Sequence, residues 1–322
     1  MKIYLGTYTK KESKGIYSID LVENQLINLN LEMEVDNPTY LARLNNDTFS
    51  VVKDGSKGGV AYYKDNYLVN QVVEEGAPPC YVSYDLERNL VFSANYHGGR
   101  VNTYKITDDG LVDHQKIVFD AGSKAHYIAF NELLNLVLVC DLGLDRVYFF
   151  EYDKNDQLVL KYQYNASEKS GPRHIIVHPT KPIVYVFTEL SSEVLVLEVN
   201  DHGVELKSRV NCLPEGVEGP KWGAAIRISN DARFIYVSNR GHDSISVFKV
   251  SDEGFDLSLI QNISTEGVQP RDFNISPNDM LCVVANHDTN NLTLFARCVE
   301  TGVLSLLQKD VYAPESVCVV FD

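Results

Sequence analysis

The segment GPRHIIVH, residues 171–178, decides the fold, because six other segments of the chain repeat its pattern. In this segment a Gly-Pro turn leads Arg173 and His174 into an apolar run that is typical of a buried β-strand. The segments that align with it are NPTYLARL (37–44), PPCYVSYD (78–85), KAHYIAFN (124–131), WGAAIRIS (222–229), QPRDFNIS (269–276) and APESVCVV (313–320). One column of this alignment holds Thr39, Cys80, His126, Arg173, Ala224, Arg271 and Glu315.

The spacing of this column shows a repeat that closes on itself. Its successive members are 41, 46, 47, 51, 47 and 44 residues apart, and the path from Glu315 through the chain end to Thr39 covers another 46. Each unit continues with two more short segments that are rich in aromatic and β-branched residues and are separated by turn residues. Seven such units, each with three recognisable strands and room for a fourth, predict an all-β seven-bladed β-propeller of four-stranded blades.

The two chain ends indicate how the ring closes. The first unit begins at its second strand, IYLGT (3–7), and the last segment, PESVCVVFD (314–322), supplies only a first strand. We therefore expect residues 1–7 and 315–321 to pair as adjacent strands of one blade, within a single propeller domain over residues 1–322. Such closure removes the exposed sheet edge that an open array would leave.

Composition narrows the possible partners. The chain has 322 residues, 44% of them hydrophobic, and a formal net charge of −15, which argues against nucleic acid or an anionic membrane as partner. No secretory signal and no apolar run of about eighteen residues is visible, so we expect a soluble cytoplasmic protein. The six scattered cysteines are interpreted as free, mostly buried thiols, and no ligand pattern calls for a metal or cofactor.

Several further motifs carry a resemblance to a known family. They are GTYT (6–9), NPTYLA (37–42), PPCYVS (78–83), ANYHGG (94–99), DLGLDRV (141–147), GPRH (171–174), TELSSEV (188–194), SNRGHDSI (238–245) and QPRDFNISP (269–277). Taken together, they resemble the seven-bladed propeller lactonases, whose best-known members are 6-phosphogluconolactonases and which have a fungal carboxymuconate cyclase as a relative. The resemblance implies lactone hydrolysis or lactone-forming cyclisation, without a known catalytic metal. It also implies that His126, Arg173, Glu189 and Arg240 are the active residues.

The blade pattern itself predicts where polar side chains gather. The start of a first strand and the end of the antiparallel second strand meet at the same rim, so both positions should lie at one mouth of the central channel. The second strands end at Thr7, Asp54, Asn95, Asp141, Glu189, Asn239 and Asn286. Asp and Asn are expected to cap the following turns there. Glu189 is longer by a methylene group, and we expect its carboxylate to reach into the mouth.

Arginines supply the local positive charge that an acidic protein needs to bind an anion. Arg173, Arg240 and Arg271 map to the rim, and Arg227 lies deeper on its strand. A planar guanidinium binds two oxygens of a phosphate or carboxylate at once. Arg271 and Arg227 are candidate substrate-binding residues, but pairing with a neighbouring carboxylate, such as Asp272 or Glu315 for Arg271, is an equal alternative.

Histidines and a cysteine near the same rim are assigned by their register. His126 shares the column of Arg173, and its ionisation near neutral pH suits general acid–base chemistry. His174 aligns with three tyrosines and is expected to be a packing residue, whereas His242 is expected to hold a turn. Cys80 has no defined base nearby, which argues against a thiol nucleophile.

The resemblance, together with the arginine-rich rim, favours an enzyme that hydrolyses a sugar lactone by direct attack of water, and the substrate that the resemblance implies is 6-phospho-D-glucono-1,5-lactone. In this hypothesis the arginines hold phosphate or polarise the carbonyl, and either Glu189 or His126 accepts the proton of water. The alternatives are a carboxymuconate-type cycloisomerase and a non-catalytic propeller that binds partners on its faces. A scaffold of the latter kind is expected to expose an apolar patch rather than an arginine-rich mouth.

Overall fold

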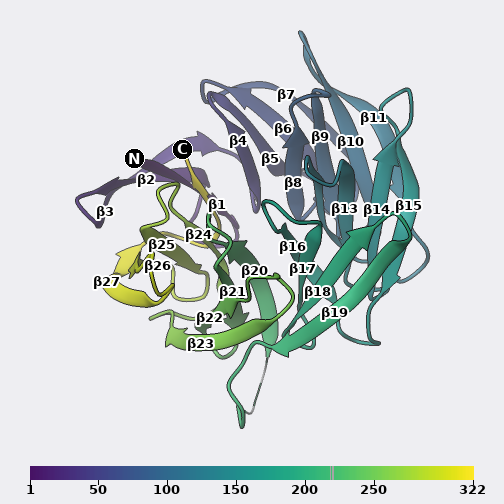
Figure 1. Ribbon diagram of the computed structural model, residues 1–322. Helices are drawn as coiled ribbons and strands as arrows, with labels where there is room; N and C mark the ends of the chain where they lie inside the picture. Colours follow the sequence, from purple (N-terminus) through teal and green to yellow (C-terminus); the bar gives the residue numbers. More distant parts are fainter. Residues whose placement is uncertain (218, 220) are drawn as a thin grey trace.

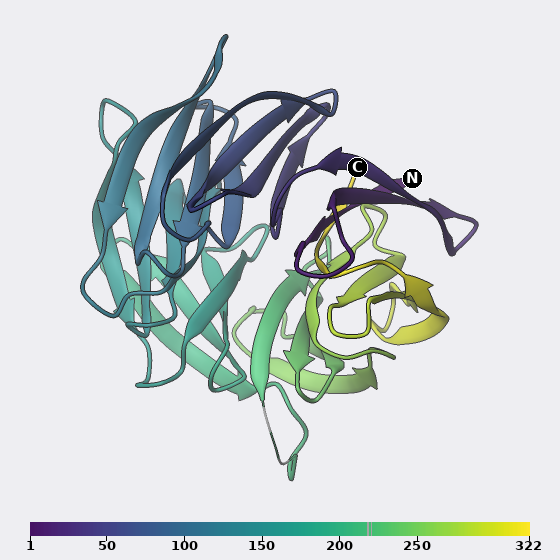
Figure 2. The same cartoon turned by 180° about the vertical axis from the view of Figure 1, so that it is seen from behind.

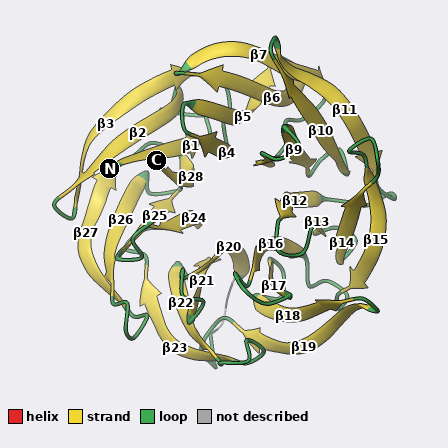
Figure 3. Cartoon of the chain, turned by 45° about the horizontal axis from the view of Figure 1, so that its top comes forward, coloured by secondary structure: helices red, strands yellow, loops and turns green. Residues whose placement is uncertain are grey.

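Alternating short strands and turns build the whole chain, because aromatic and β-branched runs are repeatedly cut by turn residues. The computed structural model describes residues 1–217, 219 and 221–322, and these contain 28 strands and no helix. Since the described residues form no helix, none of their segments is a candidate membrane-spanning helix. The strands form seven antiparallel four-stranded sheets that stand as blades around a common centre (Figures 1 and 3).

The first four blades in chain order hold these strands. The closing blade has β28 (Ser316–Phe321), β1 (Lys2–Thr7), β2 (Gly15–Val22) and β3 (Gln25–Glu34). The next has β4 (Leu41–Leu44), β5 (Asp47–Asp54), β6 (Lys57–Lys64) and β7 (Tyr67–Glu75). It is followed by β8 (Tyr81–Asp85), β9 (Leu90–Asn95), β10 (Arg100–Thr107) and β11 (Gly110–Val118). The fourth has β12 (Ala125–Asn131), β13 (Leu136–Asp141), β14 (Arg146–Tyr152) and β15 (Leu158–Asn165).

The remaining three blades repeat the same order. They are β16 (Pro172–Val177), β17 (Ile183–Thr188), β18 (Glu193–Asn200) and β19 (Gly203–Asn211); β20 (Trp222–Ile228), β21 (Phe234–Arg240), β22 (Ser244–Val250) and β23 (Leu257–Ser264); and β24 (Pro270–Ile275), β25 (Leu281–Asn286), β26 (Asn291–Arg297) and β27 (Leu304–Tyr312). The first strand of each blade lies nearest the centre of the ring and the fourth lies outside (Figure 3).

The ring closes as the sequence predicted. β1 pairs antiparallel with β28, with Ile3 opposite Phe321 and Leu5 opposite Val319. The two chain ends lie side by side in both views of the ribbon (Figures 1 and 2). This confirms the seven-bladed propeller and the placement of both termini in one blade.

The hydrophobic core lies between the blades. It divides into seven clusters, and each cluster joins the facing sides of two neighbouring blades. Phe92 of β9, for example, packs in one cluster with Val139 of β13 and Phe150 of β14. The second strands β9, β13, β17 and β25 are buried along their whole length, since a blade covers each face. This explains why they appear in the sequence as continuous apolar runs.

A layer of aromatic side chains fills the channel beneath one mouth. Tyr40 and Tyr81 have ring centroids 4.1 Å apart, and Tyr81 and Tyr127 are 4.7 Å apart. His174 joins this layer edge-on, with its centroid 5.4 Å from that of Tyr81. His174 is buried in this layer, in agreement with the packing role expected for it.

Arg227 lies away from this mouth and pairs with a carboxylate, which was the alternative to substrate binding for this candidate residue. Its Nη2 is 2.8 Å from Asp272 Oδ1, and its Nε donates to Asn274 Oδ1 at 3.2 Å. It lines a separate cavity of about 260 Å³ that shares no lining residue with the cleft described below. The physical reason is that the buried carboxylate of Asp272, on the neighbouring blade, requires a paired cation.

Candidate active site

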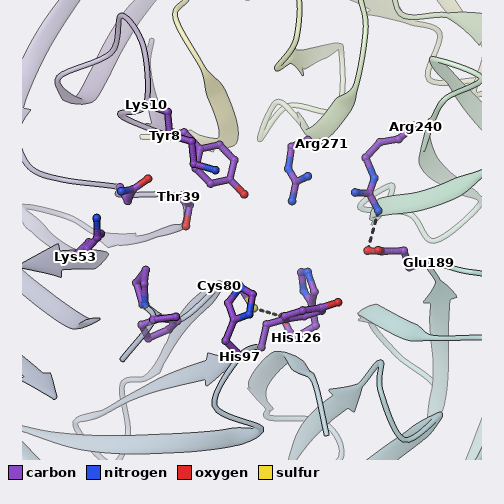
Figure 4. Close-up of a pocket in the computed structure, with 15 residues that line it drawn as sticks. Tyr8, Lys10, Thr39, Lys53, Cys80, His97, His126, Glu189, Arg240 and Arg271 are labelled. Carbon is purple, nitrogen blue, oxygen red and sulfur yellow. Dashed lines mark hydrogen bonds and ion pairs between the residues drawn. The ribbon is translucent and has the colours of Figure 1, made fainter. Parts of the chain in front are cut away.

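A cleft of about 470 Å³ opens at the mouth where first strands begin and second strands end. His126, Glu189, Arg240 and Arg271 line it, as predicted, and Figure 4 shows their side chains around one cavity. A smaller space of about 40 Å³, lined by Arg173 and His174, shares Tyr8, Thr39, Cys80, His126 and Arg271 with the cleft. The structure thus brings His126, Arg173, Glu189, Arg240 and Arg271 together.

β-Bulges explain how polar side chains reach this mouth from strands that are otherwise apolar. The register slips at the start of β12, β16 and β24, so that His126, Arg173 and Arg271 each become an extra, unpaired strand residue. A bulge of this kind re-aims its side chain and is common beside functional sites. In these three blades, the sequence column that holds His126, Arg173 and Arg271 therefore coincides with a bulge.

Glu189 follows β17 directly, and its backbone connects two blades. Its N–H donates to Gly171 O at 2.7 Å, and its carbonyl accepts from Gly223 N at 2.9 Å. Its side chain is the centre of an ion-pair cluster: Oε2 lies 3.0 Å from Arg173 Nε and 2.7 Å from Arg240 Nη2. Oε1 has no hydrogen-bond partner among the described residues, so this oxygen is available to the cleft.

Opposing effects decide the charge of Glu189. Burial favours the neutral acid, but the positive charges of Arg173, Arg240 and Arg271 outweigh it and lower the pKa of Glu189. The carboxylate is therefore ionised at neutral pH. This is the behaviour of a buried acid that is held between cations.

The two arginines of this cluster keep hydrogen atoms free after pairing with Glu189. Arg173 Nη1 also donates to Ala224 O at 2.6 Å and to His174 Nε2 at 3.2 Å, which leaves its Nη2 without a partner among the described residues. Arg240 Nη2 donates to Gly223 O at 2.8 Å, while its buried Nε has no partner in the described part of the chain. A buried N–H group without an acceptor is unusual and indicates a place for a ligand oxygen.

His126 is enclosed beside these cations. Burial, and then the charges of Arg173 and Arg271, lower the pKa of His126 well below its usual value, so the imidazole is neutral. Its ring lies edge-on to His174, with centroids 5.4 Å apart. Its Nδ1 is buried without a hydrogen-bond partner among the residues described.

Arg271 differs from the other arginines of the mouth. It makes no hydrogen bond or ion pair with any residue that the structure describes, and its Cζ lies 5.7 Å from the ring centroid of Tyr8. The alternative that it pairs with Asp272 or Glu315 is wrong. Asp272 pairs with Arg227, and Glu315 accepts four backbone N–H groups of residues 10–13 instead.

Several residues that line the cleft were not among the candidates that the sequence pattern indicated: Tyr8, Lys10, Lys53, Tyr96 and His97. Tyr8, Lys10, Tyr96 and His97 lie on loops or just past strand ends, where an alignment of strand positions gives no register, whereas Lys53 is the penultimate residue of β5. Tyr8 and His97 do fall within the motifs GTYT and ANYHGG, which was the available signal.

Cys80 and His242 behave as expected. Burial raises the pKa of the Cys80 thiol to about 12, and its Sγ donates to Ala94 O at 3.5 Å, so it is not a thiolate nucleophile. His242 holds the turn before β22 through a hydrogen bond of 2.8 Å between Nδ1 and Ser244 Oγ.

The turn-capping prediction is confirmed only in part. Asn95 accepts from Gly98 N at 2.7 Å, and Asp141 accepts from Gly143 N at 3.0 Å. Asn239 and Asn286 are buried: both donate to side-chain hydroxyls, and Asn286 also donates to the carbonyl of Thr265, just past β23. Asp54 is exposed and accepts from Gln71.

Among the described residues, no group of three His, Cys, Asp or Glu side chains is placed to hold a metal ion.

The fold and site define a class: a seven-bladed propeller with an arginine–carboxylate cleft at one mouth of its ring. The chain belongs to the seven-bladed β-propeller lactonase family, whose model matches residues 2–321. It is 37% identical to a Bacillus subtilis protein named 6-phosphogluconolactonase, over 99% of this chain and 97% of that protein.

Solved structures are similar over the full length. A Lactobacillus plantarum protein is 39% identical with a TM-score of 0.96, covering 100% of this chain and 99% of that one. A Bacteroides fragilis protein described as a putative 6-phosphogluconolactonase is 26% identical with a TM-score of 0.88, covering 100% and 97%.

Proposed function

We propose that this chain hydrolyses 6-phospho-D-glucono-1,5-lactone to 6-phosphogluconate at the described cleft. The observation that carries the proposal is the cluster of Arg173, Glu189 and Arg240, in which ionised groups keep unpartnered atoms beside a cavity. Membership of the lactonase family and similarity to a protein named 6-phosphogluconolactonase support it. This reaction belongs to the pentose phosphate pathway, so the proposal places the chain in cytoplasmic carbohydrate metabolism.

The charge of the cleft favours an anionic substrate. Its lining includes four cationic side chains (Lys10, Lys53, Arg240 and Arg271) and one carboxylate (Glu189), although the whole chain carries a net charge of −15. A cleft of one sign concentrates oppositely charged ligands and raises their rate of association. An anionic sugar lactone fits this field better than a neutral one.

In the proposed reaction, water attacks the lactone carbonyl carbon and the ring C–O bond breaks. The carbonyl oxygen gains negative charge, which the free N–H groups of Arg173 and Arg240 stabilise. The free Oε1 of Glu189 accepts the proton of water and returns it to the departing ring oxygen, and the new carboxylic acid loses its proton to solvent.

We assign the proton-accepting role to Glu189 rather than His126. A proton on His126 would place a second charge beside Arg173 and Arg271 in a buried position. Glu189 is already ionised and its free Oε1 is available to the cleft, whereas Nδ1 of His126 is buried. His126 is then a neutral group that orients water or substrate.

The experiment is a continuous assay of 6-phosphogluconolactone hydrolysis, corrected for the spontaneous reaction. We expect a rate proportional to protein concentration and a product identified as 6-phosphogluconate by NMR. No rate above the spontaneous one would contradict the proposal. Conversion of a carboxymuconate to its lactone by the same preparation would favour the cycloisomerase alternative.

A further inference from the structure

The cationic groups of the cleft form two sets on different sides of the cavity. Arg240 and Glu189 point into it from one side, whereas Arg271 and Tyr8 enter from another side (Figure 4). Arg173, which pairs with Glu189, lines the smaller adjoining space. The first set is partly neutralised by the carboxylate of Glu189. The second set contains no carboxylate among the residues that line the cleft.

Arg271 is the group that needs explanation. The guanidiniums of Arg173, Arg227 and Arg240 are each paired with a carboxylate. Arg271 is only partly exposed, yet within the described chain its contact is the face of Tyr8, 5.7 Å from Cζ to the ring centroid. A planar guanidinium held in this way keeps all its donors for an external anion, and phosphate is the anion that its fork matches.

Lys10 brings a second cation to the same ring. Its Nζ lies 4.2 Å from the ring centroid of Tyr8. The loop that carries it is fixed, because the Glu315 carboxylate accepts from the backbone N–H groups of Lys10, Lys11 and Glu12 at 2.9 Å and of Ser13 at 3.1 Å. The loop is therefore ordered before a ligand binds, so binding does not lose affinity to the entropy of ordering it.

Tyr8 connects these two cations. His287 packs edge-on against the ring of Tyr8, with the two ring centroids 5.2 Å apart. The hydroxyl of Tyr8 has no hydrogen-bond partner in the described residues. The hydroxyl can donate to a phosphate oxygen that lies between the two cations.

We propose that Arg271, Lys10 and Tyr8 form the phosphate subsite, and that the Glu189 cluster takes the lactone ring. This assignment rests on the proposed function and specifies which side of the cleft recognises each part of the substrate. Glu189 would repel a phosphate dianion placed against Arg173 or Arg240, so the phosphate is expected at the side that lacks a carboxylate.

The test compares two substrates, 6-phosphoglucono-1,5-lactone and glucono-1,5-lactone, which differ in the phosphate alone. We expect Arg271→Met and Lys10→Met each to raise KM for the phosphorylated lactone roughly tenfold or more, the effect of losing one charged hydrogen bond. For glucono-1,5-lactone, Lys10→Met should change kcat/KM less than about twofold. Arg271→Met, which also removes a charge that lowers the pKa of Glu189, should lower it several-fold less than for the phosphorylated lactone. Lys11→Met is the matched control, since this neighbouring lysine does not line the cleft.

Calorimetric binding of 6-phosphogluconate separates this subsite from the proposed activity. We expect the parent and Lys11→Met to bind it and Arg271→Met to bind at least tenfold more weakly, even if the parent hydrolyses neither lactone. Equal losses on both lactones, or parent-like binding by the folded Arg271 and Lys10 variants, would overturn the subsite. A parent that does not bind 6-phosphogluconate would overturn it as well.

Discussion

At the scale of single residues, the ionisation of Glu189 makes the stability of the fold depend on pH. Arg173, Arg240 and Arg271 lower its pKa against the effect of burial, so the ionised form stabilises the fold above the ordinary value of 4.5. This contribution disappears as the pH falls through the lower pKa of the folded state. Burial lowers the pKa of His126 well below 6.5, so this imidazole is neutral near neutral pH.

We therefore expect kcat to stay flat from about pH 8 down to about pH 5, since the profile of kcat reports groups in the enzyme–substrate complex. The measurement is kcat at saturating 6-phosphogluconolactone across this range. A fall centred near pH 6.5 would instead indicate that a histidine with an ordinary pKa is the base. The free energy of unfolding of the Glu189→Gln variant should depend less on pH in the acid range, because the carboxylate of Glu189 is absent.

Substitution of Arg173 tests whether this residue contributes to catalysis or only stabilises the contact between neighbouring blades. Arg173→Lys keeps the charge but loses the fork that joins Glu189, Ala224 and His174. If its free N–H stabilises the developing oxyanion, we expect a rate loss of roughly a hundredfold to a thousandfold. Unfolding should become easier by only about 1–3 kcal/mol, the penalty for unsatisfied buried acceptors. A folded variant that melts early but keeps the parent rate would show that Arg173 braces the blades.

Single residues were predictable from sequence only where the repeat fixes their position. The column of strand starts identified His126, Arg173 and Arg271, because each occupies the same bulge in its blade. For Arg227 the sequence left substrate binding and pairing with a carboxylate open, because its partner, Asp272, lies on another blade and a pattern within one unit does not identify it. Lys10 lies on a loop, where the repeat gives no register.

At the scale of elements, Glu315 fixes the loop between β1 and β2. Its carboxylate accepts four backbone N–H groups, which outweigh burial and lower its pKa. The clamp is therefore complete above about pH 4.5, the ordinary value, and is lost as the pH falls through the lower folded value.

We expect Glu315→Gln to reduce the free energy of unfolding by about 1–3 kcal/mol, as for other hydrogen bonds to a charged group. Urea unfolding measures this loss, and amide hydrogen exchange of residues 10–13 should become faster. Glu12→Gln is the control, because Glu12 is exposed on the same loop, and we expect a change within about 0.5 kcal/mol. Unchanged exchange at residues 10–13 in Glu315→Gln would contradict the clamp.

Strands were predictable, but the bulges at their starts were not. Alternating and continuous apolar runs identify strands by periodicity alone. A bulge depends on the register with the partner strand, as where Arg173 falls between the pairs Pro172–Thr188 and His174–Phe187. The sequence indicated the bulges only indirectly, through polar residues at strand positions that are expected to be buried and apolar.

At the scale of the whole molecule, the ring depends on the pairing of its two ends. Asp322 N donates to Lys2 O at 3.0 Å, so the termini are close enough to be joined by a short linker. We expect a circular permutant with joined ends and new termini at the turn between Asp65 and Asn66 to melt within a few degrees of the parent. Deletion of 316–322 removes β28 and exposes the edge of β1, so this variant should unfold or aggregate. A stable deletion variant would contradict closure as the basis of the fold.

The number of blades followed from the sequence because a repeat of 41–51 residues that closes on itself permits only one ring. The net charge of −15 could not show that one mouth is locally cationic, since that depends on which side chains converge in space.

The most direct test of the central claim is the rate of 6-phosphogluconolactone hydrolysis by the parent beside folded Glu189→Gln, both corrected for the spontaneous reaction. Removing a general base typically lowers the rate about a hundredfold to ten-thousandfold. We expect the parent to accelerate hydrolysis and the variant, with a circular dichroism spectrum like that of the parent, to lose at least about a hundredfold of this rate. A folded Glu189→Gln variant that hydrolyses the lactone at the parent rate would contradict the account, because Glu189 would then not be the base.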